Sequence, residues 1–191
     1  TVCGEALIWM EYAGFGGTGE SGRKTRDEIV LWVKRKRGVS RMKILITTDW
    51  YSPAVNGVVT SVLNLRRELE LRGHEVRVLT LSQDLHSSVQ DGVTRIGSVA
   101  AGLVYPGVRL RTALAGRWVR ELVEWGPDVV HSQCEFSTFF LARRIAEELN
   151  VPLIHTYHTV YEDYTHYFSP SRRWGRRAVA LFTRKIVAHT A

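Results

Sequence analysis

The 191-residue sequence has few cysteines, few prolines and no long apolar runs. Its two cysteines, Cys3 and Cys134, lie far apart, and neither belongs to a C-x-x-C pair. A disulfide framework and a zinc ribbon are therefore excluded. No apolar run approaches the roughly 20 residues that a membrane-spanning helix needs. We therefore expect any contact with a membrane to be peripheral.

Acidic residues are also in deficit. The chain carries 26 Lys and Arg against 19 Asp and Glu, which gives a net charge of +7. This balance favours anionic partners such as nucleic acid, phosphorylated ligands or an anionic membrane surface, but a basic surface also serves solubility alone. The sequence has no helix-turn-helix, zinc-finger or RNA-binding signature, so we expect no nucleic-acid partner. The Gly-rich stretch before Lys24 departs from the P-loop spacing because Arg23 precedes the lysine.

The character of the sequence changes at Met42. Residues 1–41 contain a Gly-rich patch, Gly14–Gly22, and a basic run, Lys34–Arg37. We expect this segment to be a poorly ordered leader or extension, with Met42 as the natural start. The alternative is a basic amphipathic arm that contacts lipid. Residues 42–191 are expected to form one domain.

From Met42 onward, strand patterns alternate with helix patterns, which predicts an α/β fold with a doubly wound, mostly parallel, Rossmann-like sheet. The expected strands are Lys43–Thr48, Glu75–Leu81, Gly92–Ile96, Asp128–His131, Val151–Tyr157 and Lys185–His189, and the expected helices are Gly57–Leu71, Thr112–Trp125, Ser137–Leu149 and Ser169–Thr183.

Local signals support these boundaries. Val58, Val62, Leu65 and Leu69 recur at helical spacing and predict one buried face. Gly73 is a suitable stop for the first helix. Ser137 is a candidate N-cap for a later helix. The Gly126-Pro127 pair is expected to close the helix before it.

Ligands of doubly wound sheets bind outside the carboxyl ends of the strands. This rule selects the loops Asp49–Gly57, Ser132–Ser137 and Tyr157–Phe168. In the first loop, Asn56, Gly57 and Val58 open a helix whose N-terminus would suit a phosphate. An ordinary turn and helix start explains the same residues.

The second and third loops carry titratable side chains. Glu135 could accept hydrogen bonds from a sugar or glycerol hydroxyl. Alternatively, its negative charge could simply interact favourably with the dipole of the helix that follows. In a strand, His155 and Tyr157 face one side, whereas His158 faces the other side or leaves the strand. The two histidines are thus poorly placed as joint metal ligands. The density of His, Tyr and acidic residues predicts a functional loop.

A basic aromatic segment lies near the end of the sequence. Arg172, Arg173, Trp174, Arg176 and Arg177 could face lipid phosphates, with the indole at the membrane interface. A solvated helix face is the alternative.

The order and spacing of four motifs resemble family-four glycosyltransferases of the GT-B fold over residues 42–191. The motifs are Asn56–Ser61, Arg72–Val76, Pro127–His131 and His155–Thr159. The stretches at residues 132–137 and 156–164 resemble, more narrowly, the diacylglycerol α-glucosyltransferases, which move glucose from UDP-glucose to diacylglycerol.

The resemblance implies an N-terminal, acceptor-side domain of a retaining hexosyltransferase, which needs neither a cofactor nor, in most members, a metal ion. His158 would correspond to the active-site histidine of the family. Asn56, Gly57 and Val58 would lie against the donor diphosphate and sugar. The residues expected on the acceptor side are Glu135, Tyr157, Glu162 and Asp163.

The partners implied are a nucleotide sugar such as UDP-glucose, a lipid acceptor and an anionic membrane surface. The implied location is cytoplasmic, at the inner face of the cell membrane. The family's donor-binding domain is absent from the sequence, so we expect this chain alone to be inactive. Alternatives are another family-four activity, such as a phosphatidylinositol mannosyltransferase, or a non-catalytic Rossmann-like module that binds membranes or nucleotides.

Overall fold

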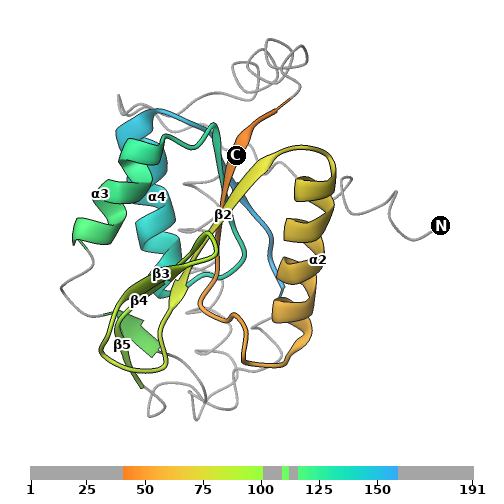
Figure 1. The fold of residues 1–191 in the computed structure, drawn as a ribbon. Coiled ribbons are helices and arrows are strands. Elements are labelled where there is room, and N and C mark those ends of the chain that lie inside the picture. The colour runs from red at the N-terminus through yellow and green to blue at the C-terminus, as the bar shows by residue number, and fades with distance from the viewer. Residues whose placement is uncertain (1–40, 101–108, 112–115, 159–191) are drawn as a thin grey trace, which may run out of the picture.

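The computed structural model describes residues 41–100, 109–111 and 116–158 (Figure 1). A six-stranded sheet has the strand order β3-β4-β2-β1-β7-β8, and β5 and β6 form a separate two-stranded sheet. The strands are β1 (Lys43–Thr47), β2 (Glu75–Leu81), β3 (Ser88–Gln90), β4 (Val93–Ile96), β5 (Ser98–Ala100), β6 (Arg109–Arg111), β7 (Val129–Ser132) and β8 (Leu153–His155), and the helices are α2 (Gly57–Leu71), α3 (Gly116–Trp125) and α4 (Ser137–Leu149).

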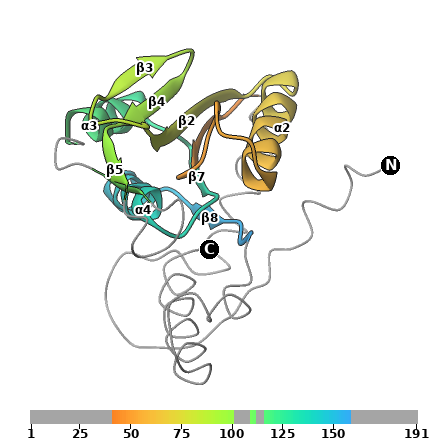
Figure 2. The same cartoon turned by 90° about the horizontal axis from the view of Figure 1, so that it is seen from below.

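The large sheet is parallel except at one edge, where β3 pairs antiparallel with β4. Helix α2 covers one face, and α3 and α4 cover the other, as the views in Figures 1 and 2 both show. The prediction of an α/β fold with a mostly parallel, doubly wound sheet is confirmed.

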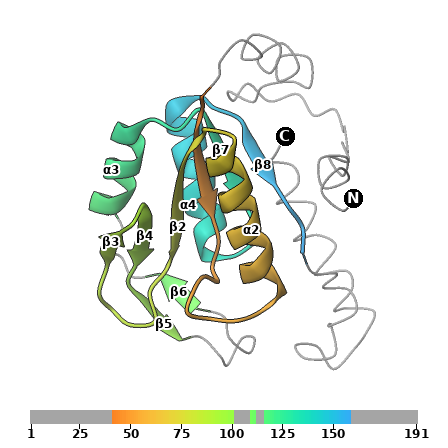
Figure 3. The same cartoon turned by 45° about the vertical axis from the view of Figure 1, so that its right-hand side comes forward.

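Alternation along the strands divides the core between the two faces. In β1, Leu45 packs into the cluster formed with α3 and α4. Its neighbours Ile44 and Ile46 pack on the other side, where Val62 of α2 meets them. Figure 3 shows α2 in front of the sheet and α4 behind it. Because both faces are covered, the middle of β1 is a continuous apolar run, Ile44–Ile46, rather than an alternating pattern.

Helix α2 has the boundaries and the buried face that its sequence predicts. Val62 is fully buried, and Val58, Leu65 and Leu69 pack against the same cluster. The chain leaves the helix through Gly73, whose φ of +84° is a conformation that L-residues with a side chain rarely adopt. The expected glycine stop is confirmed.

The structure corrects one predicted helix start and describes only part of another predicted helix. Ser137 is the first helical residue of α4 rather than its N-cap, and its hydroxyl donates to the carbonyl of Arg109 (3.0 Å). An acidic side chain from the loop after β1 serves α4 instead, as described below. Helix α3 begins at Gly116 in the described part of the chain, and residues 112–115 of the expected helix lie outside it.

The last described strand, β8, is shorter than expected and ends at His155.

The short strands β3, β5 and β6 were not predicted. The β5–β6 pair depends on Arg109, whose guanidinium donates to the carbonyls of Ser82 (3.1 Å), Gln83 (2.7 Å) and Ser98 (3.0 Å). Such a contact between distant segments leaves no local periodicity in the sequence.

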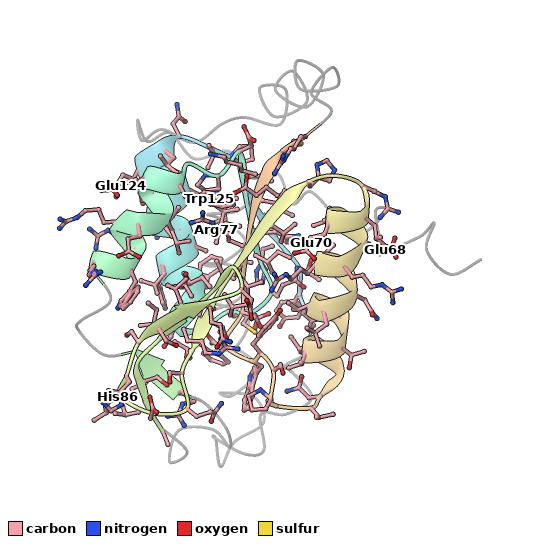
Figure 4. All side chains as sticks on the ribbon, in the orientation of Figure 1. Glu68, Glu70, Arg77, His86, Glu124 and Trp125 are labelled. Atoms are coloured by element: carbon pink, nitrogen blue, oxygen red, sulfur yellow. The ribbon has the colours of Figure 1, made fainter. Side chains whose placement is uncertain are left out.

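The amino edge of the sheet is closed by Trp125 at the end of α3. Its indole donates to the Glu75 carboxylate (2.7 Å), and the Arg77 guanidinium lies 4.6 Å from the ring centroid. Figure 4 shows Arg77 and Trp125 side by side between α3 and β2. Gly126 then ends α3 with a φ of +67°, which confirms the predicted stop.

Several expectations fall outside the described residues. These are the organisation of residues 1–40, the helix at 169–183 and the strand at 185–189. None of the helices within the described ranges is both long enough and apolar enough to cross a membrane.

Candidate functional site

The chain reverses its direction of winding between β1 and β7. From β1 it proceeds to β2 on one side, whereas β7 and β8 lie on the other side. Main-chain hydrogen bonds continue past the strand ends, from Gln133 to the carbonyl of Thr47 (2.8 Å) and from Thr156 to that of Ser132 (2.9 Å). The loops after β1, β7 and β8 therefore begin side by side, at the topological switch point where such sheets bind ligands.

Asp49 connects the first of these loops to α4. Its Oδ1 accepts a hydrogen bond from the Thr138 amide (2.8 Å), one of the first-turn donors that a helix leaves without an internal acceptor. The carboxyl is buried, and this burial is the main cause that raises its pKa to about 6. The capping hydrogen bond opposes that increase without cancelling it. Asp49 thus couples the end of β1 to the start of α4.

Asn56, Gly57 and Val58 form the start of α2. Oδ1 of Asn56 accepts from the Val59 amide (2.9 Å), so Asn56 is the N-cap of α2. The amides of Gly57 and Val58 belong to the first turn, which has no internal acceptors for them. Gly57 is exposed with open space around it, and the turn carries no acidic side chain. This helix end can receive an anion.

Glu135 is nearly fully buried. Its Oε1 lies 3.4 Å from Nε2 of His155, and both side chains are only 4% exposed. The His155 ring packs edge-on against Phe139 of α4, with the ring centroids 5.5 Å apart. Glu135 therefore belongs to a buried acid–histidine pair, and its expected contact with an acceptor remains a prediction.

His158 stands beyond the end of β8, as the alternation of side chains suggested. Its Nε2 is 2.7 Å from Oε1 of Gln133. The amide nitrogen of Gln133 is in turn 2.8 Å from Nε2 of His131, which also lies 2.8 Å from the Thr156 hydroxyl. A continuous line of polar side chains thus connects β7 to the residue expected in the active site.

Burial dominates the electrostatics of this line. It lowers the pKa of His131 to about 4, with the neighbouring histidines His155 and His158 acting in the same direction. The pKa of His158 is also lowered, mainly by burial, while the nearby Glu135 carboxylate opposes the shift. Both rings are therefore held neutral near pH 7.

The thiol of Cys134 is not a nucleophile at this site. Burial raises its pKa to about 12, and its sulfur lies 3.4 Å from the Thr48 hydroxyl. Only a thiolate reacts readily, and near pH 7 this group is a thiol. Cys134 therefore helps to join the first two loops by packing.

The remaining expected site residues are only partly described. Tyr157 is 37% exposed and its ring centroid lies 6.5 Å from that of His155, so these two side chains share a side as expected. The other expected residues, outside the described ranges, are Glu162, Asp163, Arg172, Arg173, Trp174, Arg176 and Arg177. Within the described ranges, no three His, Cys, Asp or Glu side chains are grouped to hold a metal ion.

Sequence reasoning missed the parts played by Asp49, His131 and Gln133. All three stand at or just after the carboxyl end of a parallel strand, and that position was the available signal. Their partners are 89, 25 and 25 residues away in sequence, respectively, which no local pattern reveals.

Comparison with known proteins shows which family the chain resembles. Residues 55–191 match the model of Glycosyltransferase Family 4. The chain is 38% identical over 129 residues to the alpha-monoglucosyldiacylglycerol synthase of Streptococcus pneumoniae and 39% identical over 130 residues to that of Acholeplasma laidlawii. Each alignment covers 67% of this chain, but 29% and 32% of the relatives.

A more distant relative is the GDP-mannose-dependent alpha-mannosyltransferase of Corynebacterium glutamicum, which is 26% identical over 126 residues. That alignment covers 62% of this chain and 29% of the relative. The chain thus spans less than a third of each of these three proteins. The family model covers well over half of this chain. The chain belongs to glycosyltransferase family 4.

Proposed function

We propose that residues 42–191 form the acceptor-side domain of a retaining hexosyltransferase that moves glucose from UDP-glucose to a membrane lipid such as diacylglycerol. The observation that carries this proposal is the 38–39% identity to two alpha-monoglucosyldiacylglycerol synthases. The mannosyltransferase relative favours GDP-mannose as the second candidate donor.

The geometry suits such a reaction in two ways. The open N-terminus of α2, with Gly57 and Val58, can face the donor diphosphate, where backbone amides and the helix dipole stabilise negative charge. His158, held by Gln133, stands at the same edge of the sheet and is proposed to contact the transferred sugar and the acceptor. Much of the rate enhancement would then come from holding the acceptor hydroxyl in line with the sugar.

The acceptor side is proposed to include Glu135, Tyr157, Glu162 and Asp163. Because Glu135 is buried against His155, we propose that it acts there by shaping the wall rather than by direct contact. The proposed membrane-facing residues, by analogy with other basic aromatic segments, are Arg172, Arg173, Trp174, Arg176 and Arg177.

A chimeric enzyme tests the function. Residues 42–191 replace the matching segment of the Acholeplasma laidlawii synthase, and transfer of radiolabelled glucose from UDP-glucose to diacylglycerol in vesicles is measured. We expect transfer, and we expect His158→Ala to abolish most of it. His86→Ala is the matched control, because His86 is a fully exposed histidine on the β2–β3 connection, labelled in Figure 4.

The possible outcomes separate the alternatives. Transfer only with GDP-mannose would replace the proposed donor by the second candidate. A chimera that melts like the parent enzyme but transfers neither sugar would contradict the enzymatic proposal. Vesicle binding that is unaffected by His158→Ala in that case would point to a membrane-binding module.

The membrane surface has its own test. Sedimentation of the 191-residue chain with anionic and with neutral vesicles should show binding to the anionic ones only. Exchange of the four arginines of the basic aromatic segment for glutamine should weaken this binding, with about 1 kcal/mol lost for each charge near the surface. Equal binding of the parent and the glutamine variant would remove these residues from the proposed surface.

A further inference from the structure

Gln133 is the central member of the polar line between β7 and His158. It follows β7 directly, and its side chain is 1% exposed, in the loop that leads into α4. One end of its amide lies 2.8 Å from Nε2 of His131, and the other end lies 2.7 Å from Nε2 of His158. A buried amide held at both ends has little freedom to turn.

An amide is asymmetric, because its nitrogen can only donate and its oxygen can only accept. The nitrogen of Gln133 faces His131, so Nε2 of His131 must be the unprotonated acceptor. The oxygen faces His158, so Nε2 of His158 must carry a proton to donate. The two imidazoles are therefore held in opposite tautomers.

The Nε2 atom of His131 has a second polar neighbour besides Gln133. The Thr156 hydroxyl also points at Nε2 of His131 (2.8 Å) and can donate to it. Burial keeps this ring neutral near pH 7, so that it retains an unprotonated nitrogen. The other titratable groups beside the line are Glu135 and His155, which pair with each other.

We propose that Gln133 is a positioning residue that fixes His158 as its Nε2–H tautomer and leaves Nδ1 as the acceptor for a substrate hydroxyl. The role of His158 toward a substrate rests on the proposed function, whereas the assignment of its tautomer does not. A neutral ring with an acceptor nitrogen suits the hydroxyl of a sugar or a glycerol. It does not suit a phosphate oxygen, which would require a donor.

Nitrogen-15 NMR of the full 191-residue chain tests the tautomer directly. At about pH 8, above the ordinary histidine pKa, His158 should be in the Nε2–H form, and its ring N–H proton should exchange slowly with water. His131 should be in the Nδ1–H form. A His158 ring protonated at Nδ1, or an Nε2–H that exchanges as fast as that of His86, would overturn the proposal.

Variants separate positioning from folding. Gln133→Leu should give His158 the tautomer mixture of a free imidazole and a rapidly exchanging ring proton. Gln133→Glu, which retains an accepting oxygen, should restore the slow exchange, and it serves if the leucine variant does not fold. Gln90→Leu is the matched control, because Gln90 is exposed on β3. Unchanged His158 signals in a folded Gln133→Leu variant would overturn the proposal.

In the active chimera, Gln133→Leu should lower kcat/KM about tenfold, the effect of losing one hydrogen bond. Gln133→Glu should recover part of that loss. An inactive parent chimera would count against the proposed function alone, since the NMR result does not depend on turnover. Full activity of the leucine variant would show that the tautomer is not used in the reaction and would overturn the positioning role.

Discussion

Replacement of Asp49 by asparagine should make the protein more stable near neutral pH. The carboxyl is buried between β1 and α4 and accepts the Thr138 amide hydrogen bond through Oδ1 (2.8 Å). Asparagine keeps an accepting oxygen of the same reach but carries no charge. The substitution therefore retains the cap and removes the cost of burying an anion.

The magnitude follows from the pKa of Asp49. Burial raises this pKa from 3.8 to about 6, so the folded state binds the proton more tightly than the unfolded state does. Below pH 3.8 the carboxyl is protonated in both the folded and the unfolded state, and its burial carries no cost of charge. As the pH rises through about 6 the folded state must ionise, and this part of the free energy of unfolding is lost. The difference amounts to about 3 kcal/mol. Asp49→Asn should match the parent chain near pH 4 and exceed its stability by up to this amount at pH 7.

Urea unfolding at a series of pH values measures the difference between the two chains. Asp91→Asn is the matched control, because Asp91 is exposed and its φ of +51° is one that asparagine also adopts. An exposed substitution of this kind should change the unfolding free energy by less than about 0.5 kcal/mol. A lower stability of Asp49→Asn at pH 7 would refute the reasoning, since it would mean that the charge–dipole attraction at α4 outweighs burial.

Three further substitutions test the fold by urea unfolding. Asn56→Ala removes the N-cap of α2 and should cost about 1 kcal/mol; no loss would mean that water replaces the cap. Phe139→Ala should cost about 3–5 kcal/mol because Phe139 is 2% exposed. The adjacent Phe140, at 56% exposed, should tolerate the same change, and equal losses would contradict the assigned core. Gly97→Ala should cost about 1–3 kcal/mol, since a Cβ there would meet the backbone of the β2–β3 connection; an unchanged midpoint would show that this connection can move away.

The sequence predicted which loops lie together at one edge of the sheet, but not the contacts that their side chains make. The rule that ligands bind at the carboxyl edge of such sheets selects the loops that contain Asp49, Gln133 and His158 from the sequence alone. For Glu135 the sequence left open a contact with a ligand hydroxyl or an interaction with the helix dipole; the structure buries its side chain beside His155, and the contact with an acceptor stays a prediction. The sequence gives the chemistry of each side chain, whereas the direction in which a side chain points depends on the residues that pack around it.

Periodicity within the sequence determined most of the elements, because local spacing alone decides which face of a helix or strand is apolar. The extent of α2, the strands β1 and β2, and the stop at Gly73 all follow from neighbouring residues. Tertiary structure alone decided the order of the strands, the short strands held by Arg109, the capping of α4 by Asp49 and the line from His131 to His158. These contacts join residues that are close only after the sheet has formed. They therefore do not follow from any periodic spacing of residues in the sequence.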